Sequence, residues 1–355
     1  MSQNIVFVDT VSRRAYSEKT LRETGLGGTE ATTIRIAEEL DALVLQERRE
    51  RPEGRYRPVS ESVKPTHIVT LREPKVALEL SRRYPKAKHY LWLHDLHLRG
   101  TRRSKELAGC WSGLKEGNVT IIAVSNFHLK QIRSVVKDQE DTSLLRRIYN
   151  PIAPSPESVD GFDKNKLVYF SSPHKGLSSA VTAFRWLRHR NQDLQLFVAN
   201  PGYWYWEDLV TDQSSGIVDM GALPHNEVLL QVRTALCTFS PNYVYPETFG
   251  LVFAESNAVG TPVLTHDIGA AREVIDDAEQ VLPLPRFAGS MFKLERGYLP
   301  WKPRLHLIAN RLTCYRAYEE KIQAWQMGRR PVVQADPRFH IQNVCREWID
   351  MMAEE

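Results

Sequence analysis

Two glutamates, Glu247 and Glu255, stand eight positions apart on either side of a largely apolar segment. A carboxylate accepts hydrogen bonds, and it can take a pair of them from the neighbouring hydroxyls of a ribose or hexose ring. Between the two acids, the free backbone N–H groups of Gly250, Leu251 and Val252 would begin a helix and form a seat for phosphate or another anion. Two hydroxyl acceptors around an anion seat predict a site for a sugar nucleotide.

The elements around the two glutamates must bring them to one place. Residues 235–241 predict a strand, residues 242–250 its loop, and residues 251–259 a short helix that ends ahead of Gly260. In open α/β sheets, ligands bind outside the carboxyl ends of the strands, where this loop lies. The spacing alone also fits a plainer interpretation, in which Glu247 is an ordinary loop residue and Glu255 lies on a helix surface.

Short apolar runs of strand length alternate with longer helical segments along the chain. We expect helical structure over residues 27–50 and 176–191. This alternation predicts an α/β fold, with parallel sheets covered by helices. The expected strands are 4–10, 66–71, 89–95, 119–125, 166–172, 194–200, 217–223, 235–241 and 261–267.

The length of 355 residues favours two domains over one. Three prolines between Asn150 and Pro156 indicate a connector. We therefore expect an N-terminal domain of residues 1–150 and a C-terminal domain of residues 151–335. A final helix over residues 336–355 is expected to pack back on the first domain.

Charge is distributed unevenly. Residues 1–150 hold 27 Lys and Arg against 19 Asp and Glu, a balance of +8, which leaves −4 for the other 205 residues because the total is +4. Basic runs at 82–89 and 99–106 could meet an anionic lipid surface or another polyanion, or could simply be solvated. Nucleic acid is not an expected partner, because no recognised binding module accompanies the charge.

Four scattered cysteines without a CxxC pair suggest neither a zinc site nor a disulfide framework, and they fit a reducing compartment. The first residues do not resemble a signal peptide, and no apolar run approaches the roughly 20 residues that span a bilayer. We expect a cytoplasmic protein, with peripheral association at the inner face of the membrane as a further hypothesis.

Residues 246–275 resemble the E-x7-E donor-site signature of retaining glycosyltransferases of the GT-B fold, family 4, also described as glycosyl transferases group 1. The resemblance extends over most of the chain, and it is strongest in the C-terminal half. Shorter matches follow in the same order as in the family: Gly25–Glu30, Trp92–Asp95, Ala123–Phe127, Tyr149–Ile152, His174–Leu177 and Met220–Leu230.

The resemblance implies two Rossmann-like α/β domains that face each other across a cleft for donor and acceptor. It implies transfer of a sugar from a UDP- or GDP-linked donor to a glycan or lipid-linked acceptor, in bacterial surface polysaccharide or glycoconjugate assembly. No cofactor and no metal are implied. The chain also contains no Asp-x-Asp, the element with which many other glycosyltransferases hold a divalent ion. His89, His94 and His97 have no further residue to complete a metal site.

By this resemblance, three residues are catalytic. Glu247 contacts the hydroxyls of the donor sugar, Lys175 neutralises the diphosphate leaving group, and His94 lies near the anomeric carbon. Without the resemblance, Lys175 would be interpreted as a solvated loop lysine. Glu255 would hold the ribose.

The remaining donor contacts are implied in the same way. Thr248 to Val252 would meet the sugar and diphosphate through backbone N–H groups, Leu223 and Pro224 the nucleobase, and Gly27 and Gly28 the phosphates or the sugar. On physical grounds the glycine pair is an ambiguous turn. The complete set is Gly27, Gly28, Ser171, Ser172, Leu223, Pro224, Thr248, Phe249, Gly250, Leu251, Val252 and Glu255.

The chain departs from the family in one important respect. The family usually carries an arginine about six residues before the lysine, whereas residues 166–175 contain none, and Ser171, Ser172 and His174 are the nearby polar candidates. An aromatic run, Tyr203–Trp206, could stack on an acceptor sugar or be buried. Two other functions remain open, a sugar-nucleotide 2-epimerase of the same fold and a non-catalytic partner that binds a sugar nucleotide.

Overall fold

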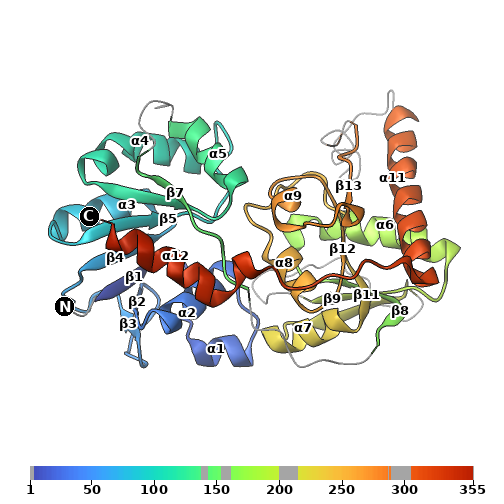
Figure 1. Cartoon of the computed structure of the whole chain (residues 1–355), viewed down its shortest axis with the longest axis horizontal. Coiled ribbons are helices and arrows are strands. Elements are labelled where there is room, and N and C mark those ends of the chain that lie inside the picture. Colours follow the sequence, from blue (N-terminus) through green and yellow to red (C-terminus); the bar gives the residue numbers. More distant parts are fainter. Residues whose placement is uncertain are drawn as a thin grey trace. The chain divides into compact units, whose positions relative to one another are not determined.

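The computed structural model describes residues 4–136, 143–152, 161–199, 215–286, 288 and 305–354 (Figure 1). Its contacts divide the chain into two compact units. The first unit contains the described residues up to Leu21, those from Gly27 to Ile152, and those from Pro337 onward. The second contains Arg22–Leu26 and the described residues between Ile152 and Pro337. The predicted aromatic run Tyr203–Trp206 lies outside the described residues.

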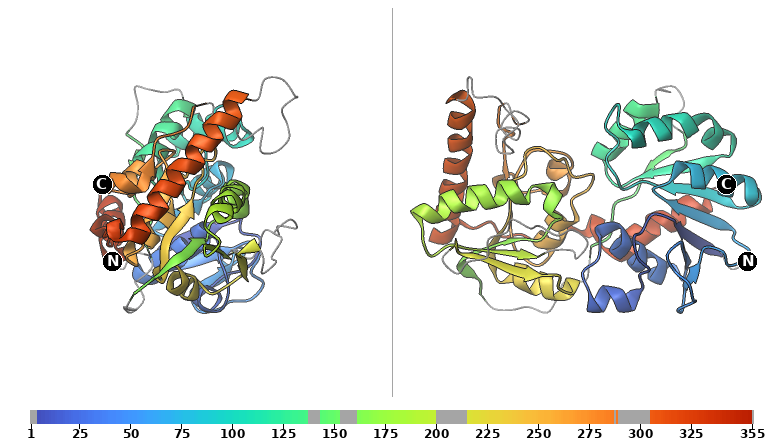
Figure 2. Two further views of the ribbon diagram at one scale, coloured as in Figure 1. Left: turned by 90° about the vertical axis from the view of Figure 1, so that its right-hand side faces the viewer. Right: turned by 180° about the vertical axis from the view of Figure 1, so that it is seen from behind.

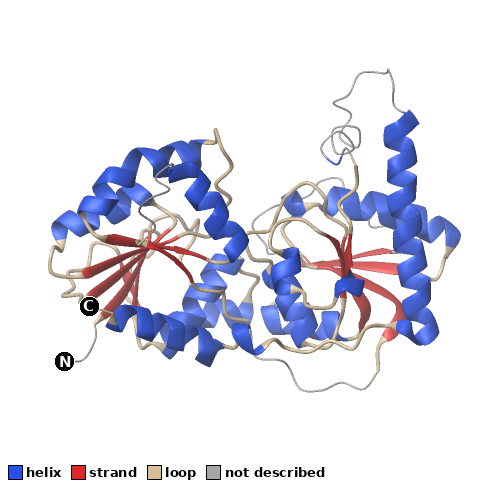
Figure 3. Ribbon diagram, turned by 45° about the horizontal axis from the view of Figure 1, so that its top comes forward, coloured by secondary structure: helices blue, strands red, loops and turns tan. Residues whose placement is uncertain are grey.

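The first unit is built on a parallel sheet of seven strands within the described ranges, in the order β3-β2-β1-β4-β5-β6-β7. Its central strands β1 and β4 are buried along their whole length, as expected for runs rich in valine and isoleucine with helices on both faces (Figure 3). The strands are β1 Ile5–Asp9, β2 Leu43–Gln46, β3 Tyr56–Pro58, β4 His67–Leu71, β5 Lys88–Trp92, β6 Val119–Ala123 and β7 Leu145–Arg147.

Helices from both ends of the chain cover this first sheet (Figure 2). The C-terminal helix α12 packs its Trp348 ring against Trp92 and Phe7, at centroid distances of 5.1 and 6.1 Å. The last turn of α12 is capped from the sheet, because Lys88 donates to the carbonyl of Met352 at 3.1 Å. The helical segments are α1 Glu18–Glu23, whose last two residues belong to the second unit, α2 Gly28–Glu39, α3 Pro74–Arg83, α4 Arg102–Glu116, α5 Asn126–Val136, η5 Pro337–Phe339 and α12 Ile341–Ala353.

The second unit contains a six-stranded parallel sheet among its described residues, in the order β10-β9-β8-β11-β12-β13. The strands are β8 Asp163–Tyr169, β9 Gln195–Ala199, β10 Ile217–Gly221, β11 Ala235–Ser240, β12 Val263–His266 and β13 Val281–Leu282. The helical segments are η1 Pro173–Lys175, α6 Leu177–Arg190, α7 His225–Arg233, α8 Leu251–Ala258, α9 Ala271–Val274, η3 Ala278–Gln280, α11 Leu305–Ala324 and η4 Trp325–Arg329. In this unit the largest buried cluster combines residues of the sheet with those of α6 and α11.

The predicted α/β class is confirmed, and each expected strand is present with slightly different ends. The continuous helix expected over residues 27–50 is wrong beyond Leu40. Asp41 adopts a left-handed backbone with φ of 49°, which ends α2, and Leu43–Gln46 then pairs in parallel with β1. Val44 and Leu45 are buried in that sheet, so tertiary packing overrides the helical pattern. No helix in the described ranges is long and apolar enough to cross a bilayer.

Candidate functional site

Lys175 and Glu247 meet at the point where the second sheet reverses its strand order. The chain runs from β8 outward through β9 and β10, then returns to place β11 on the other side of β8. Lys175 lies in η1 after β8, and Glu247 in the loop after β11. The lysine Nζ is 2.6 Å from Glu247 Oε2. Such reversal points are where open α/β sheets bind ligands, at the carboxyl ends of the strands.

Glu247 is held by its backbone as well as by this ion pair. It forms a parallel bridge with Gly269, and its carbonyl accepts a hydrogen bond from Ala270 N at 3.0 Å. Gly269 has φ of 67°, and a Cβ at that position would lie 2.5 Å from the Glu247 carbonyl oxygen. Glycine is therefore required here to bring the two backbones together. The sequence analysis did not select Gly269, although a glycine directly after β12 was its available signal.

Two titratable side chains near the ion pair, Tyr169 and His174, have shifted pKa values. Tyr169 ends β8, and its buried hydroxyl donates to the carbonyl of Ser172 at 3.0 Å. Burial, with the nearby negative charge of Glu247, raises the pKa of Tyr169. Burial, followed by the charge of Lys175, lowers the pKa of His174, against a smaller opposite effect of Glu247. His174 is therefore neutral at neutral pH and does not replace the arginine that the family pattern would supply.

Glu255 is also buried and paired, but with a different residue. It is the fifth residue of α8, its side chain is 3% exposed, and its Oε1 lies 2.9 Å from Nε2 of His225, the first residue of α7. Glu247 is 7% exposed. A loop carboxylate and a helix-surface carboxylate would both be solvated, so the plainer interpretation of the two glutamates does not fit. The sequence analysis missed His225, because adjacent helices rather than sequence spacing bring it to Glu255.

The predicted anion seat begins at Gly250. This residue is the N-cap of α8 with φ of 94°, and no side-chain cap accepts a hydrogen bond from the first turn. An added Cβ would lie 2.5 Å from Cδ2 of Phe253, so glycine is required. Leu251 and Val252 follow as the first helical residues, and Phe249 is buried just before them. Helix N-termini of this kind leave backbone N–H groups that favour an anion.

The other predicted contacts of the second unit lie on neighbouring loops. Ser171 and Ser172 are buried in the turn after β8, where the Ser172 carbonyl also accepts a hydrogen bond from Lys175 N at 2.9 Å. Leu223 packs against the buried residues of α7. Pro224, with φ of −53°, is the N-cap of that helix.

Gly27, Gly28 and His94 lie in the first unit, whereas the predicted site residues described so far lie in the second. Gly27 caps α2 with ordinary extended backbone, and Gly28 begins the helix. His94 follows β5, is 9% exposed, and has its ring centroid 4.3 Å from that of Trp92. Burial, followed by the positive charge of Arg72 and the neighbouring His128, lowers its pKa well below the usual value. The imidazole of His94 is therefore neutral.

Arg72 was not selected from the sequence, yet it lies at the corresponding reversal point of the first sheet. It follows β4, and its Nη2 is 3.7 Å from Oδ1 of Asp9, which ends β1, and 3.3 Å from Oε1 of Glu30. Its backbone has φ of 66°, a left-handed conformation that is strained for arginine. The Asp9 carboxylate also accepts a hydrogen bond from the Tyr16 hydroxyl at 2.9 Å. Polar residues directly after two neighbouring strands were the available signal.

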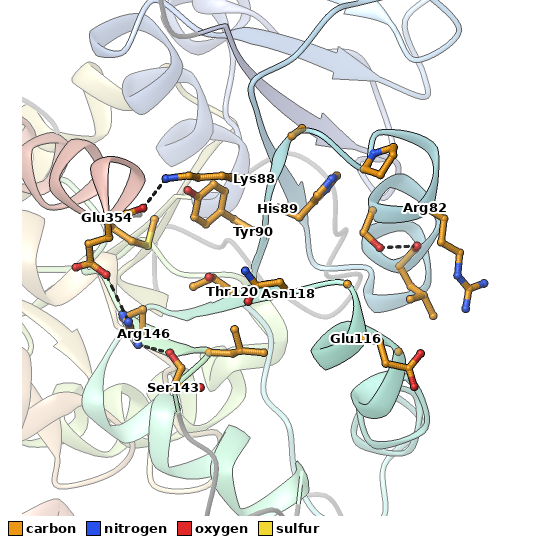
Figure 4. Close-up of a pocket in the computed structure, with 18 residues that line it drawn as sticks. Arg82, Lys88, His89, Tyr90, Glu116, Asn118, Thr120, Ser143, Arg146 and Glu354 are labelled. Atoms are coloured by element: carbon orange, nitrogen blue, oxygen red, sulfur yellow. Dashed lines mark hydrogen bonds and ion pairs between the residues drawn. The ribbon is translucent and has the colours of Figure 1, made fainter.

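A cavity of about 710 Å³ lies elsewhere in the first unit, around the amino ends of β5 and β6 (Figure 4). It includes Arg82, Lys88 and His89 of the basic run 82–89, but none of the residues predicted to bind a sugar nucleotide. Lys88 donates a hydrogen bond to the C-terminal helix, and Arg146 pairs with Glu354 at 3.4 Å.

The described residues contain no group of three or more histidine, cysteine or acidic side chains arranged to hold a metal ion.

Part of the second unit matches a known family model. Residues 162–286 match the family model of glycosyl transferases group 1. A 114-residue region is 30% identical to phosphatidyl-myo-inositol mannosyltransferase of Mycobacterium leprae (strain TN), covering 31% of this chain and 29% of that protein. The chain therefore matches less than a third of that relative's length.

Several solved structures resemble almost the whole chain, and two of them serve as examples. Sucrose-phosphate synthase from Thermosynechococcus elongatus has a TM-score of 0.61 at 14% identity and covers 98% of each chain. Anabaena HepE in complex with UDP-glucose has a TM-score of 0.59 at 13% identity and covers 99% of each chain. At these identities the likeness concerns the fold, and it identifies the two parallel-sheet units as a two-domain, Rossmann-like GT-B fold.

Proposed function

We propose that this chain is a retaining, metal-independent glycosyltransferase that moves a sugar from a UDP- or GDP-linked donor to a glycan or lipid-linked acceptor. The observation that carries the proposal is the Lys175–Glu247 pair at the reversal point of the second sheet, inside the region that matches glycosyl transferases group 1. A cation and a carboxylate side by side suit a donor with a diphosphate and a sugar. Assembly of bacterial surface polysaccharide or glycoconjugate is the proposed setting.

The proposed chemistry uses the charge of Lys175 and the first turn of α8. Cleavage of the bond between sugar and diphosphate develops negative charge on the departing diphosphate and positive charge on the sugar ring. Lys175 and the N–H groups after Gly250 stabilise the departing diphosphate. Glu247 organises the donor sugar while a hydroxyl of the acceptor attacks from the side that the diphosphate leaves, and the proton of that hydroxyl passes to the departing diphosphate. This same-face attack retains the anomeric configuration.

Donor binding requires an exchange of partners. Lys175 now faces Glu247 at 2.6 Å, so it turns from the carboxylate toward the diphosphate when the donor enters. Glu247 then accepts hydrogen bonds from the hydroxyls of the sugar. Its backbone bridge to Gly269 holds the main chain of Glu247 during the exchange.

The first test is a thermal-shift panel of UDP, GDP, ADP and their glucose, N-acetylglucosamine and mannose derivatives. A ligand that binds the native state raises the apparent unfolding temperature. Lys175→Ala should weaken binding of the preferred nucleoside diphosphate by at least about tenfold, since charged hydrogen bonds contribute roughly 1.5–3 kcal/mol. Lys164→Ala, an exposed lysine on β8, is the matched control.

The second test separates the candidate functions. With the donor that binds, Glu247→Ala should abolish most sugar transfer while Glu320→Ala, exposed on α11, should not. A wild-type protein that epimerises the sugar nucleotide without an acceptor would support the epimerase instead. Binding without turnover of any kind, unchanged by Glu247→Ala, would support a non-catalytic partner.

Association with an anionic membrane is proposed for the first 150 residues on account of their charge of +8. Arg82, Arg83 and Lys86 are exposed in the basic run at the end of α3 and after it. Flotation with vesicles that contain phosphatidylglycerol should recover the protein, and salt should reduce the recovery. Failure to float at low salt would contradict the membrane proposal without affecting the donor site.

A further inference from the structure

His225 contacts the buried carboxylate of Glu255, and the proposed reaction assigns it no role. It begins α7, and its Nε2 lies 2.9 Å from Oε1 of Glu255 on α8. The Glu255 side chain is 3% exposed and that of His225 24%. A carboxylate withdrawn from water to this extent needs hydrogen bonds from the protein to remain charged. His225 supplies one of them.

The direction of this hydrogen bond follows from its chemistry. An ionised carboxylate only accepts hydrogen bonds, so the proton must lie on Nε2 of the imidazole. His225 is therefore the donor of this hydrogen bond and Glu255 the acceptor. The bond restrains rotation of the carboxylate, because one of its two oxygens is held from a separate helix.

The helix that carries His225 is itself anchored at both ends. At its start, Pro224 is the N-cap residue, and His225 binds Glu255 of α8 at 2.9 Å. At its end, the hydroxyl of Thr261 donates to the carbonyl of Val232 at 3.0 Å. Thr261 follows α8, so α7 is tied to α8 near both of its ends.

We propose that His225 is a positioning residue that aligns Glu255 for the ribose hydroxyls of the nucleotide, and thereby makes the site selective for ribonucleotides. This inference rests on the proposed function, in which Glu255 receives the ribose. His225 directly follows Leu223 and Pro224, the loop proposed to meet the nucleobase. His225 thus links the loop proposed to contact the nucleobase with Glu255, the residue proposed to contact the ribose.

The measurable consequence is discrimination between a ribonucleotide and its 2′-deoxy analogue. A buried carboxylate aligned for a hydroxyl loses that partner when the 2′-hydroxyl is absent, and the mismatch weakens binding. We expect the wild-type protein to bind UDP on the order of 10- to 100-fold more tightly than 2′-deoxy-UDP. If GDP is the preferred nucleotide, GDP and 2′-deoxy-GDP form the pair.

Isothermal titration calorimetry on four variants tests the role of His225. The amide of His225→Gln reaches the position of Nε2 and should preserve most of the discrimination. The shorter amide of His225→Asn cannot reach Oε1 and should reduce the ratio of the two dissociation constants to within about threefold of one, as should His225→Ala. His189→Ala, an exposed histidine in the last turn of α6, should keep the wild-type ratio.

The outcomes separate this inference from the proposed function. A wild-type protein that binds none of the nucleoside diphosphates overturns the proposed function itself. Binding of UDP and 2′-deoxy-UDP with equal affinity overturns only the role of His225. Equal ratios in the Gln and Asn variants also overturn that role, because the two amides differ in reach and not in hydrogen-bonding chemistry. Both variants are compared only at temperatures where circular dichroism shows them folded.

Discussion

Replacing Glu247 with glutamine keeps the shape of the side chain and removes the negative charge that faces Lys175. In the wild-type protein this carboxylate competes with the diphosphate for the ammonium group, at a Nζ–Oε2 distance of 2.6 Å. Glu247→Gln should therefore bind UDP more tightly than the wild type while it transfers sugar more slowly. Opposite changes in binding and turnover distinguish this geometry from a general loss of the site.

The size of each change follows from the exposure of the pair. Lys175 is 38% exposed, so water screens the attraction, and ion pairs of this kind contribute about 0.2–1 kcal/mol. Releasing the lysine should improve the affinity for UDP by about 1.5- to 5-fold. Loss of an interaction with the developing charge on the sugar should reduce turnover by about 100- to 1,000-fold.

Titration calorimetry with UDP and a coupled assay of UDP release from the donor sugar measure the two effects on one protein preparation. Glu320→Gln, exposed on α11, controls for the change in net charge and should match the wild type in both assays. If Glu247→Gln weakens UDP binding and turnover by the same factor, the carboxylate acts in ground-state binding. The proposed exchange of partners would then be refuted.

Three further predictions concern the elements that support the site. Gly250→Ala forces alanine to φ of 94° and places its Cβ 2.5 Å from Phe253, so urea unfolding should show a loss of about 1–3 kcal/mol; an unchanged midpoint would contradict it. Gly269→Ala places a Cβ 2.5 Å from the carbonyl of Glu247. Expressed as free energies, the loss of donor turnover should exceed the loss of unfolding stability. Equal losses of the two free energies would argue against this contact. Burial lowers the pKa of His266 to about 4, below the usual value of about 6.5, so the unfolded chain takes up its proton first as pH falls. Stability should therefore decline by roughly 3 kcal/mol between pH 6.5 and 4, and His266→Gln, though less stable at pH 7, should lose that much less over the same range in urea titrations.

The class of fold could be predicted because strands that are buried in a parallel sheet appear in the sequence as short apolar runs. Residues 67–71 and 119–123 are examples, since both strands are enclosed by helices and contain mostly isoleucine, valine and leucine. Short edge strands lack this signal. Tyr56–Pro58 and Leu145–Arg147 have three residues each, and they are strands only because a neighbour provides hydrogen bonds.

Only part of the candidate site could be predicted from the sequence. Glu247 could be named because it follows a strand within a conspicuous motif, whereas Lys175 was named only from the family resemblance. Their contact at 2.6 Å depends on β8 and β11 being neighbours. Arg72 lies in none of the matched motifs, and His225 lies in one, Met220–Leu230, without being singled out there. Their partners come from helices or strands distant in sequence, and sequence spacing contains no information on that pairing.

The return of α12 to the first unit has a consequence for biosynthesis. Trp348 is fully buried against Trp92 and Phe7, so residues near the end of the chain complete a core that begins within the first ten residues. Domains generally fold as they leave the ribosome, from the N-terminus onward. Here the second unit is synthesised in full before the first can close. The nascent first unit therefore exposes an aromatic surface until α12 has been made, and a nonsense mutation just before α12 should impair the unit that was made first.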